Sequence, residues 1–316
     1  MSGKHLRPSI VPADRAGIAA AAAMIVDEKP VALPTETVYG LAARADSAKA
    51  VAAIYTAKGR PSFNPLIVHV PDAAHAEALA DFDERARSLA AQFWPGALTM
   101  VLPLKRGARI ASAVTAGLDT IALRCPAHPV MRAVLDASGV PLAAPSANRS
   151  GGVSPTSAAH VAESLQGHID LVLDGGVCAT GLESTIVALR SDGTWEQLRP
   201  GPVSLEFLQD ALGANRESHA GGWIEAPGQL ASHYAPGKPV RLNADAAEPD
   251  EFLIGFGALA GDYNLSPSAD LSEAAARLYA GLHKGAASPQ RRIAIAAVPE
   301  SGLGAAINDR LRRAAA

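Results

Sequence analysis

The chain alternates helix-like and strand-like segments from Asp14 to about Leu212, which restricts this part to the α/β fold classes. The expected helices are Arg15–Asp27, Ala48–Lys58, Ala73–Ala80, Glu84–Phe93, Pro129–Ala137, Ser157–Leu165 and Leu205–Leu212. The expected strands are Pro30–Leu33, Leu66–His69, Leu98–Leu102, Thr120–Arg124, Leu142–Ala144, Leu171–Leu173, Thr185–Leu189 and Glu196–Leu198. Strands outnumber the helices between them, and the last two resemble a hairpin. We therefore predict a mixed α/β sheet with flanking helices rather than a purely parallel, doubly wound sheet.

Residues 213–239 interrupt this pattern with repeated glycine and proline. The segment is too long and too punctuated for an ordinary connection, so we interpret it as a linker or a functional loop. Further strands are expected at Val240–Leu242, Phe252–Phe256 and Arg292–Ala297, with helices at Leu271–Leu282 and Ala305–Arg313. The chain is thus predicted to divide into a first domain at 1–212, the linker at 213–239, and a small three-layer α/β (Rossmann-like) domain at 240–316.

Composition excludes several classes of protein. The net charge of -3 argues against a globally basic surface for nucleic acid, so any attraction for phosphate must be local. Cys125 and Cys178 are too few for a disulfide framework and lack metal-ligand spacing, which predicts two buried thiols in a reducing compartment. The early apolar run Ile18–Val26 is too short to span a bilayer. We expect a cytoplasmic protein with no membrane association.

Two short segments combine cations with neutral hydrogen-bonding groups. Lys58 and Arg60 flank a glycine at the end of an expected helix, and Ser146 and Asn148 follow an expected strand. Two cations with several neutral partners can hold a polyphosphate, although cations also favour helix C-termini with no ligand present. The sequence contains no GxxxxGK[ST] loop, so nucleotide binding would need another design.

Other polar residues stand at the ends of apolar strands, where ligands bind in α/β sheets. They are Thr35 and Thr37 after the strand ending at Leu33, His69, Arg124, Ser184 and Arg199. A lone histidine at a strand end is more often structural, and the Thr35–Thr37 segment could be no more than a polar loop. Neither a GxSxG elbow nor an HExxH pair occurs, so a hydrolase triad and a zinc site have no support. The Gly255–Ala260 match to a dinucleotide fingerprint is not followed by an expected helix.

Five motifs occur in one order along the chain: Pro34–Leu41, Lys58–Pro61, Phe93–Gly96, Ala144–Asn148 and Ser184–Ile186. With them the chain resembles the Sua5/YrdC/YciO family of threonylcarbamoyl-AMP synthases. His233–Pro236 and the closing Gly302–Leu311 resemble the long, two-domain Sua5 form. The resemblance implies a YrdC-like mixed twisted sheet and a nucleotidyltransferase.

The implied reaction combines L-threonine, bicarbonate or CO2, and ATP into threonylcarbamoyl-AMP and pyrophosphate. Downstream tRNA threonylcarbamoyl-transfer proteins would use the product to form N6-threonylcarbamoyladenosine (t6A). The resemblance places threonine at Arg124, Thr35, Thr37, His69, Ser146 and Ser184. It places ATP at Lys58, Arg60, Asn64, Ala144, Asn148, Ser154, Arg199 and Tyr234. Lys58 and Arg60 are the expected catalytic cations, Mg²⁺ is expected with ATP, no protein-bound metal is expected, and the linker should cross the cleft.

Two alternatives remain open at this point. The chain could be a non-catalytic module for double-stranded RNA or tRNA, although its acidity and few aromatics argue against that. It could also be another carbamoyl-adenylate enzyme, but 316 residues leave no room for the extra domains of such relatives. Family members often carry basic residues where this chain has Gln229–Ser232, which weakens the case for a cation there. Direct tRNA contact, the oligomeric state and the choice between Thr35 and Thr37 are left undecided.

Overall fold

The computed structural model describes residues 7–213, 224–229 and 232–316, which form two sheets. The large sheet runs in the order β1-β8-β2-β3-β7-β4-β6-β5-β9-β10. Its strands are β1 (Ser9–Pro12), β2 (Val31–Leu33), β3 (Gly40–Arg44), β4 (Ile67–His69), β5 (Leu98–Pro103), β6 (Thr120–Arg124), β7 (Leu142–Ala143), β8 (Leu171–Asp174), β9 (Thr185–Leu189) and β10 (Trp195–Arg199). Parallel pairs such as β4 with β6 and antiparallel pairs such as β5 with β6 both occur. The predicted mixed sheet is confirmed.

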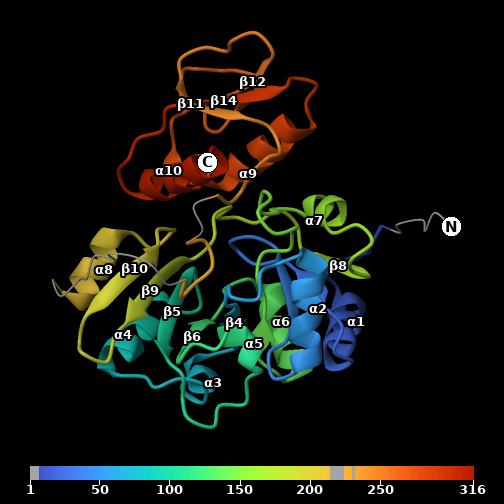
Figure 1. Ribbon diagram of the computed structural model, residues 1–316, viewed down its shortest axis with the longest axis vertical. Coiled ribbons are helices and arrows are strands. Elements are labelled where there is room, and N and C mark those ends of the chain that lie inside the picture. The colour runs from blue at the N-terminus through green and yellow to red at the C-terminus, as the bar shows by residue number, and fades with distance from the viewer. Residues whose placement is uncertain (1–6, 214–223, 230–231) are drawn as a thin grey trace.

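Helices cover both faces of the large sheet (Figure 1). They are α1 (Arg15–Val26), α2 (Ala48–Lys58), α3 (Ala73–Glu77), α4 (Glu84–Phe93), α5 (Ser112–Thr115), α6 (Pro129–Ser138), α7 (Ala158–Ser164) and α8 (Leu205–Leu212). Because side chains alternate along a strand, Val31 and Leu33 pack against α1 and α6 while Ala32 faces the opposite core with α2. The middle of the sheet is therefore buried on both sides, whereas the edge strand β1 is largely exposed. On the later strands, Ile67, Ala122 and Ile186 belong to a separate core that includes the linker residue Ala226.

Local sequence signals account for the helix ends that bear on the site. The Ser47 hydroxyl accepts a hydrogen bond from the Ala50 amide, which caps the start of α2. Gly59 ends the same helix in the left-handed conformation (φ 61°), which a glycine adopts with little strain. Lys58 and Arg60 thus lie on either side of a helix C-cap, as the sequence predicts.

The second sheet is parallel and consists of β11 (Val240–Ala244), β14 (Arg292–Ala296), β12 (Glu251–Gly255) and β13 (Tyr263–Asn264), in that spatial order. Both of its helices, α9 (Leu271–Ala287) and α10 (Leu303–Ala314), pack in one core with Ile293 and Ile295. Leu253 and Ala294, on the other face, are covered by the loop residue Leu259. The small unit therefore has two layers where we expected three, because both helices cover the same face of its sheet.

The two helices of the small unit face the large unit (Figure 1). Leu182 and Val153 of the large unit share a core with α9 and α10. The sequence analysis missed β1, β3, β13 and α5, and it extended α3 beyond Glu77 although Ala80 pairs with Leu104 in a β-bridge. Within the described ranges, no helix combines the length and apolar character needed to cross a membrane.

Candidate active site

A cavity of about 50 Å³ lies at the ends of several strands of the large sheet and beneath the linker. Its lining includes ten of the predicted site residues: Thr35, Thr37, Arg60, His69, Arg124, Ala144, Ser146, Ser184, Arg199 and Tyr234. The other four, Lys58, Asn64, Asn148 and Ser154, are buried but do not line it. Pockets for small molecules usually enclose roughly 300–1,000 Å³, so the free space at the site is small in this conformation.

Lys58 joins the two motif segments that stand far apart in the sequence. Its Nζ donates to the carbonyl oxygens of Ser146 and Asn148, both at 2.6 Å. Burial, with Arg60 and Arg149 nearby, lowers the pKa of Lys58 well below its usual value. The side chain therefore fixes the wall behind the cavity, with its ammonium directed at carbonyl groups.

Arg60 presents its guanidinium to the cavity and is held from behind by Asn64. Nη2 donates to Asn64 Oδ1 at 2.6 Å and to the Pro65 carbonyl at 2.8 Å, while Nε donates to the Asn64 carbonyl at 3.2 Å. Burial lowers the pKa of Arg60 to about 10, so it remains a cation at neutral pH. Asn64, predicted as an ATP ligand, instead orients this cation.

Arg124 lies at the end of β6 and already has a carboxylate partner. Its Nη2 contacts Glu36 Oε1 at 2.6 Å, Nη1 donates to Thr37 Oγ1 at 2.9 Å, and Nε donates to the Gly96 carbonyl at 3.1 Å. Burial raises the pKa of Glu36, but the charge and hydrogen bond of Arg124 outweigh this and hold it below its usual value. The sequence analysis missed Glu36 as a partner, although it lies between the two threonines that were singled out.

Thr35 and Thr37 have different surroundings. Thr35 Oγ1 donates to the Val38 carbonyl at 2.7 Å and accepts from the amides of Thr37 and Val38, so it shapes the turn. Thr37 Oγ1 bonds to Thr35 Oγ1 and to Arg124. The Thr37 hydroxyl thus contacts the Arg124 cation directly, whereas the hydrogen bonds of the Thr35 hydroxyl all stay within its own turn.

His69 ends β4 as a neutral, buried imidazole. Burial lowers its pKa to about 3, and its Nδ1 has no hydrogen-bond partner in the described part of the chain. A buried nitrogen without a partner is costly, and a ligand donor could satisfy it. Asn148 also has one buried polar atom without a partner. Its side-chain nitrogen donates to the carbonyls of Arg149 and Gly152, but its Oδ1 has no hydrogen-bond partner in the described part of the chain.

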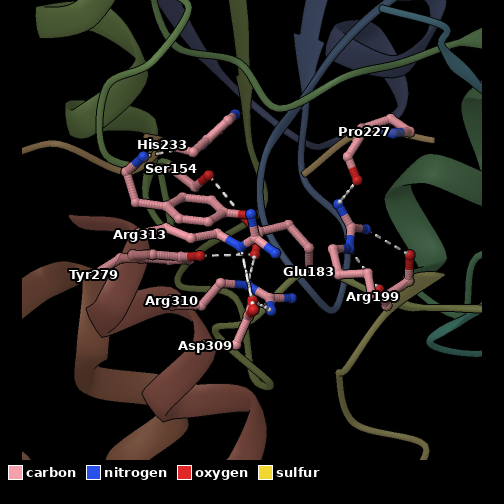
Figure 2. Close-up of polar contacts among 11 residues, drawn as sticks. Ser154, Glu183, Arg199, Pro227, His233, Tyr279, Asp309, Arg310 and Arg313 are labelled. Carbon is pink, nitrogen blue, oxygen red and sulfur yellow. Dashed lines mark hydrogen bonds and ion pairs between the residues drawn. The ribbon is translucent and has the colours of Figure 1, made fainter. Parts of the chain in front are cut away.

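Arg199, the last residue of β10, bonds to Ser184, which directly precedes β9, and to the linker. Nε donates to the Ser184 carbonyl at 3.0 Å, Nη2 donates to Ser184 Oγ at 3.1 Å, and Nη1 donates to the Pro227 carbonyl at 3.2 Å (Figure 2). Gly228 packs against this side chain with φ 89°, and an added Cβ would lie 2.9 Å from Arg199 Cδ. Only glycine fits both the backbone conformation and the close approach.

The described part of the linker lies across the cavity. Pro227, Gly228, His233 and Tyr234 all line it, and the Tyr234 ring is almost completely buried. Gln229 Oε1 accepts from the amides of Glu225 and Ala226, so this residue supports its own loop. Leu230 and Ala231, where a basic contact was in doubt, lie outside the described residues.

Ser154, predicted as an ATP ligand, instead donates to Glu183 Oε1 at 2.6 Å. Glu183 lines the cavity and was not predicted, although it directly precedes Ser184 at the start of a buried strand. In the described ranges, no three His, Cys, Asp or Glu side chains come together to hold a metal ion. The polar part of the cavity lining thus consists of three arginines, two histidines, hydroxyl groups and one carboxylate.

The family model described as telomere recombination, for Sua5, YciO and YrdC proteins, matches residues 23–201. The model described as the threonylcarbamoyl-AMP synthase C-terminal domain matches residues 203–316. The chain belongs to the Sua5/YrdC/YciO family. The family predicted from the motifs is thereby confirmed, in its long form with the Sua5 C-terminal domain.

Relatives in this family match the chain over most of its length. A threonylcarbamoyl-AMP synthase of Bacillus subtilis (strain 168) is 39% identical, covering 94% of this chain and 92% of the relative. The crystal structure of Pyrococcus abyssi Sua5 complexed with L-threonine superposes with a TM-score of 0.88 at 36% identity, covering 97% of each chain. Escherichia coli YciO shares the fold of the first unit, with a TM-score of 0.53 at 19% identity over 61% of this chain and 96% of that one.

Proposed function

We propose that this chain is an L-threonylcarbamoyladenylate synthase, which uses L-threonine, bicarbonate or CO2, and ATP. The observation that carries the proposal is the convergence of Arg60, Arg124 and Arg199 with Thr37 and Ser184 on one enclosed cavity. The similarity to a Sua5 protein crystallised with L-threonine supports the same assignment. The relatives named threonylcarbamoyl-AMP synthase, matched over nearly the whole chain, support it further.

The two ends of the cavity suit the two substrates. At one end, the Arg124 cation can pair with the threonine carboxylate, with Thr37 and His69 beside it. At the other end, Arg60 and Arg199 can pair with phosphate oxygens. Lys58 serves the nucleotide end by holding the Ser146 and Asn148 backbone in place.

The reaction needs no protein nucleophile. The threonine amine attacks CO2, or bicarbonate with loss of water, and the nitrogen loses a proton to give N-carboxythreonine. A carboxylate oxygen of this carbamate attacks the α-phosphorus of ATP, and the bond to the β-phosphate oxygen breaks with release of pyrophosphate. The residues would act by positioning the reactants and stabilising charge on the departing pyrophosphate. Mg²⁺ would enter with ATP as part of the substrate, since the described residues provide no cluster of metal ligands.

The linker completes this proposal as a cover over the site. Tyr234 and Gly228 close the cavity, and the small volume that remains means that the linker must move to admit ATP. Once closed, it would exclude water from a hydrolysable adenylate. We place the enzyme in the cytoplasm, where the buried free thiols Cys125 and Cys178 would stay reduced, and its product would pass to tRNA threonylcarbamoyl-transfer proteins.

The test is pyrophosphate release from MgATP in bicarbonate buffer, with L-threonine, with L-serine and with no amino acid. We expect release that depends on threonine and bicarbonate, with threonylcarbamoyl-AMP identified by mass spectrometry. Folded protein that releases no pyrophosphate with threonine would contradict the proposal. Salt-dependent tRNA binding by such a protein would favour the RNA-binding alternative.

A further inference from the structure

Glu183 is a buried carboxylate in the wall of a site proposed to bind a polyanion. It receives three hydrogen bonds: from Ser154 Oγ to Oε1 at 2.6 Å, from Tyr279 Oη to Oε2 at 2.7 Å, and from Arg310 Nε to Oε2 at 2.9 Å (Figure 2). Burial raises the pKa of Glu183, but the charges of Arg310 and Arg199 and these hydrogen bonds hold it at about 2. The carboxylate is therefore ionised and fully paired at neutral pH.

Two of the three donors come from the small C-terminal unit. Tyr279 belongs to α9 and Arg310 to α10, and both side chains are completely buried. Arg310 also donates from Nη1 to Asp309 Oδ2 at 2.8 Å, and its guanidinium lies 5.6 Å from the centre of the Tyr234 ring. The Gly302–Leu311 motif thus delivers a cation to the wall of the cavity rather than to solvent.

The same segment of backbone carries the nucleotide end of the site. Ser184, the next residue after Glu183, accepts two hydrogen bonds from Arg199 through its carbonyl and hydroxyl oxygens. Gly181, two residues before Glu183, packs so closely on α9 that an added Cβ would lie 2.4 Å from Ala276 Cα. A continuous path of contacts therefore runs from α9 and α10 through Glu183 and Ser184 to Arg199.

We propose that Arg310 and Tyr279 are positioning residues of the nucleotide site, and that they act through Glu183 to fix Ser184 and Arg199. The Arg310 cation also offsets the negative charge of Glu183, which would otherwise repel the triphosphate. The C-terminal unit is then part of the active site as well as an anchor for the linker. This inference rests on the proposed function for its substrate, ATP.

The first test compares Arg310→Met with Arg312→Met on the same helix. Arg312 is exposed and pairs with Glu300 at the surface, so it controls for the loss of one arginine from α10. We expect Arg310→Met to raise the KM for ATP about tenfold, to raise the KM for threonine less than threefold, and to keep a cooperative thermal transition. Arg312→Met should keep the wild-type values. A folded Arg310→Met enzyme with the wild-type KM for ATP would overturn the inference.

A milder pair of variants covers the case in which Arg310→Met fails to fold. Tyr279→Phe removes only the hydroxyl that donates to Glu183, and Tyr263→Phe removes one elsewhere in the same unit, where the Tyr263 hydroxyl bonds to Arg277. We expect the KM for ATP to rise about threefold in Tyr279→Phe and to stay unchanged in Tyr263→Phe. Equal values in both variants would contradict a role for Tyr279.

A double-variant cycle tests whether Arg310 acts through Glu183. In a Glu183→Met background, adding Arg310→Met should change the KM for ATP by less than twofold, because both the ion pair and the hydrogen bonds to residue 183 are already lost. If the two substitutions instead multiply their separate effects on the KM for ATP, Arg310 acts on ATP by another route and the inference fails.

Calorimetric titration with ATP separates this inference from the proposed function, because it needs no turnover. If the wild type binds ATP but releases no pyrophosphate with threonine, the proposed reaction is wrong. In that case, weaker ATP binding by Arg310→Met than by Arg312→Met would still support the positioning role, and equal binding would refute it.

Discussion

The two ends of the cavity each centre on an arginine at a strand end, but the two arginines are held in place differently. Arg124 is fixed by Glu36, Thr37 and Gly96, all of which belong to the first unit. Arg199 is fixed by Ser184 and by Pro227 of the linker, and Ser184 follows a residue that is bound to the C-terminal unit. The end that we propose for threonine is thus complete within the first unit, whereas the end that we propose for the nucleotide depends on parts that come later in the chain.

This difference has a consequence for motion. A group held by sheet residues shares the stability of the core, whereas a group held by a linker can be released by local opening. With Pro227, Gly228 and Tyr234 in its lining, the cavity has a volume of about 50 Å³, well below the roughly 300–1,000 Å³ of ordinary small-molecule pockets. We therefore expect the nucleotide end to rearrange during each catalytic cycle and the threonine end to stay preorganised.

The largest expected effect comes from replacing Arg124 and Arg199, one at a time, by alanine. Arg124→Ala should lower kcat/KM for threonine about a hundredfold, or ~2.7 kcal/mol, with the KM for ATP changed less than threefold. Arg199→Ala should instead raise the KM for ATP. Because Arg124→Ala leaves Glu36 buried without its cation, thermal denaturation should be measured alongside, with Arg124→Lys as the variant that keeps the charge. If both alanine variants impair the same substrate, the division of the cavity into two ends is wrong.

The second effect concerns two histidines of the cavity lining, His69, which is buried, and His233, which is half-buried. The pKa of His69 is lowered to about 3 and that of His233 to about 4, in both cases chiefly by burial, against a usual value of 6.5. The unfolded chain takes up a proton below pH 6.5 while folded His69 does not, so stability falls as the pH decreases toward 3. From pH 7 to pH 5, this lowers the free energy of unfolding by about 2 kcal/mol for a histidine that is protonated only when the whole protein unfolds.

His69→Gln should therefore make the loss of unfolding free energy between pH 7 and pH 5 smaller by that amount, as measured by urea denaturation. His233→Gln should reduce the loss by less, since local opening of the linker can expose His233 without unfolding the protein. An equal effect of both variants would mean that the linker opens only together with the core.

The third effect uses the close contact of Gly228 with Arg199. Gly228→Ala should displace the arginine and raise the KM for ATP about tenfold, because the new Cβ would lie 2.9 Å from Arg199 Cδ. Gly237→Ala is the matched control: Gly237 also has a positive φ (75°), but an added Cβ meets nothing within 4 Å. Both variants strain the backbone, so only the difference between them reports on Arg199. Equal KM values for ATP would show that the contact is unimportant.

Much of this arrangement could be predicted from local patterns in the sequence. Short continuous apolar runs located β4, β6 and β9, and polar residues at or next to their ends identified His69, Arg124 and Ser184, all of which line the cavity. Such patterns work because a strand end fixes where its last side chain lies. The strand β3 was missed although it lies inside the large sheet, because its sequence, Gly-Leu-Ala-Ala-Arg, contains no β-branched or aromatic residue.

Contacts between distant segments could not be predicted in the same way. The partners of Lys58 are two backbone carbonyls that no residue type reveals, and its contact with phosphate stays a prediction. The pairing of Glu183 with Arg310 joins the loop before β9 to helix α10 of the small unit, and the closing motif in itself says nothing about the residue it contacts. The sequence therefore identified most residues of the cavity lining, while the residues that hold them in place required the three-dimensional structure.

The smallest expected effect separates the two threonines that follow β2. Thr37→Val removes the hydroxyl that accepts from Arg124, and should raise the KM for threonine about fivefold with little loss of stability. Thr35→Val removes the hydroxyl that organises the turn to Val38, and should lower the unfolding free energy by about 1–3 kcal/mol. Steady-state kinetics and urea denaturation of both variants would test this. Because the turn belongs to the preorganised threonine end, a Thr35→Val enzyme that loses threonine affinity without losing stability would show that Thr35, and not Thr37, makes the substrate contact.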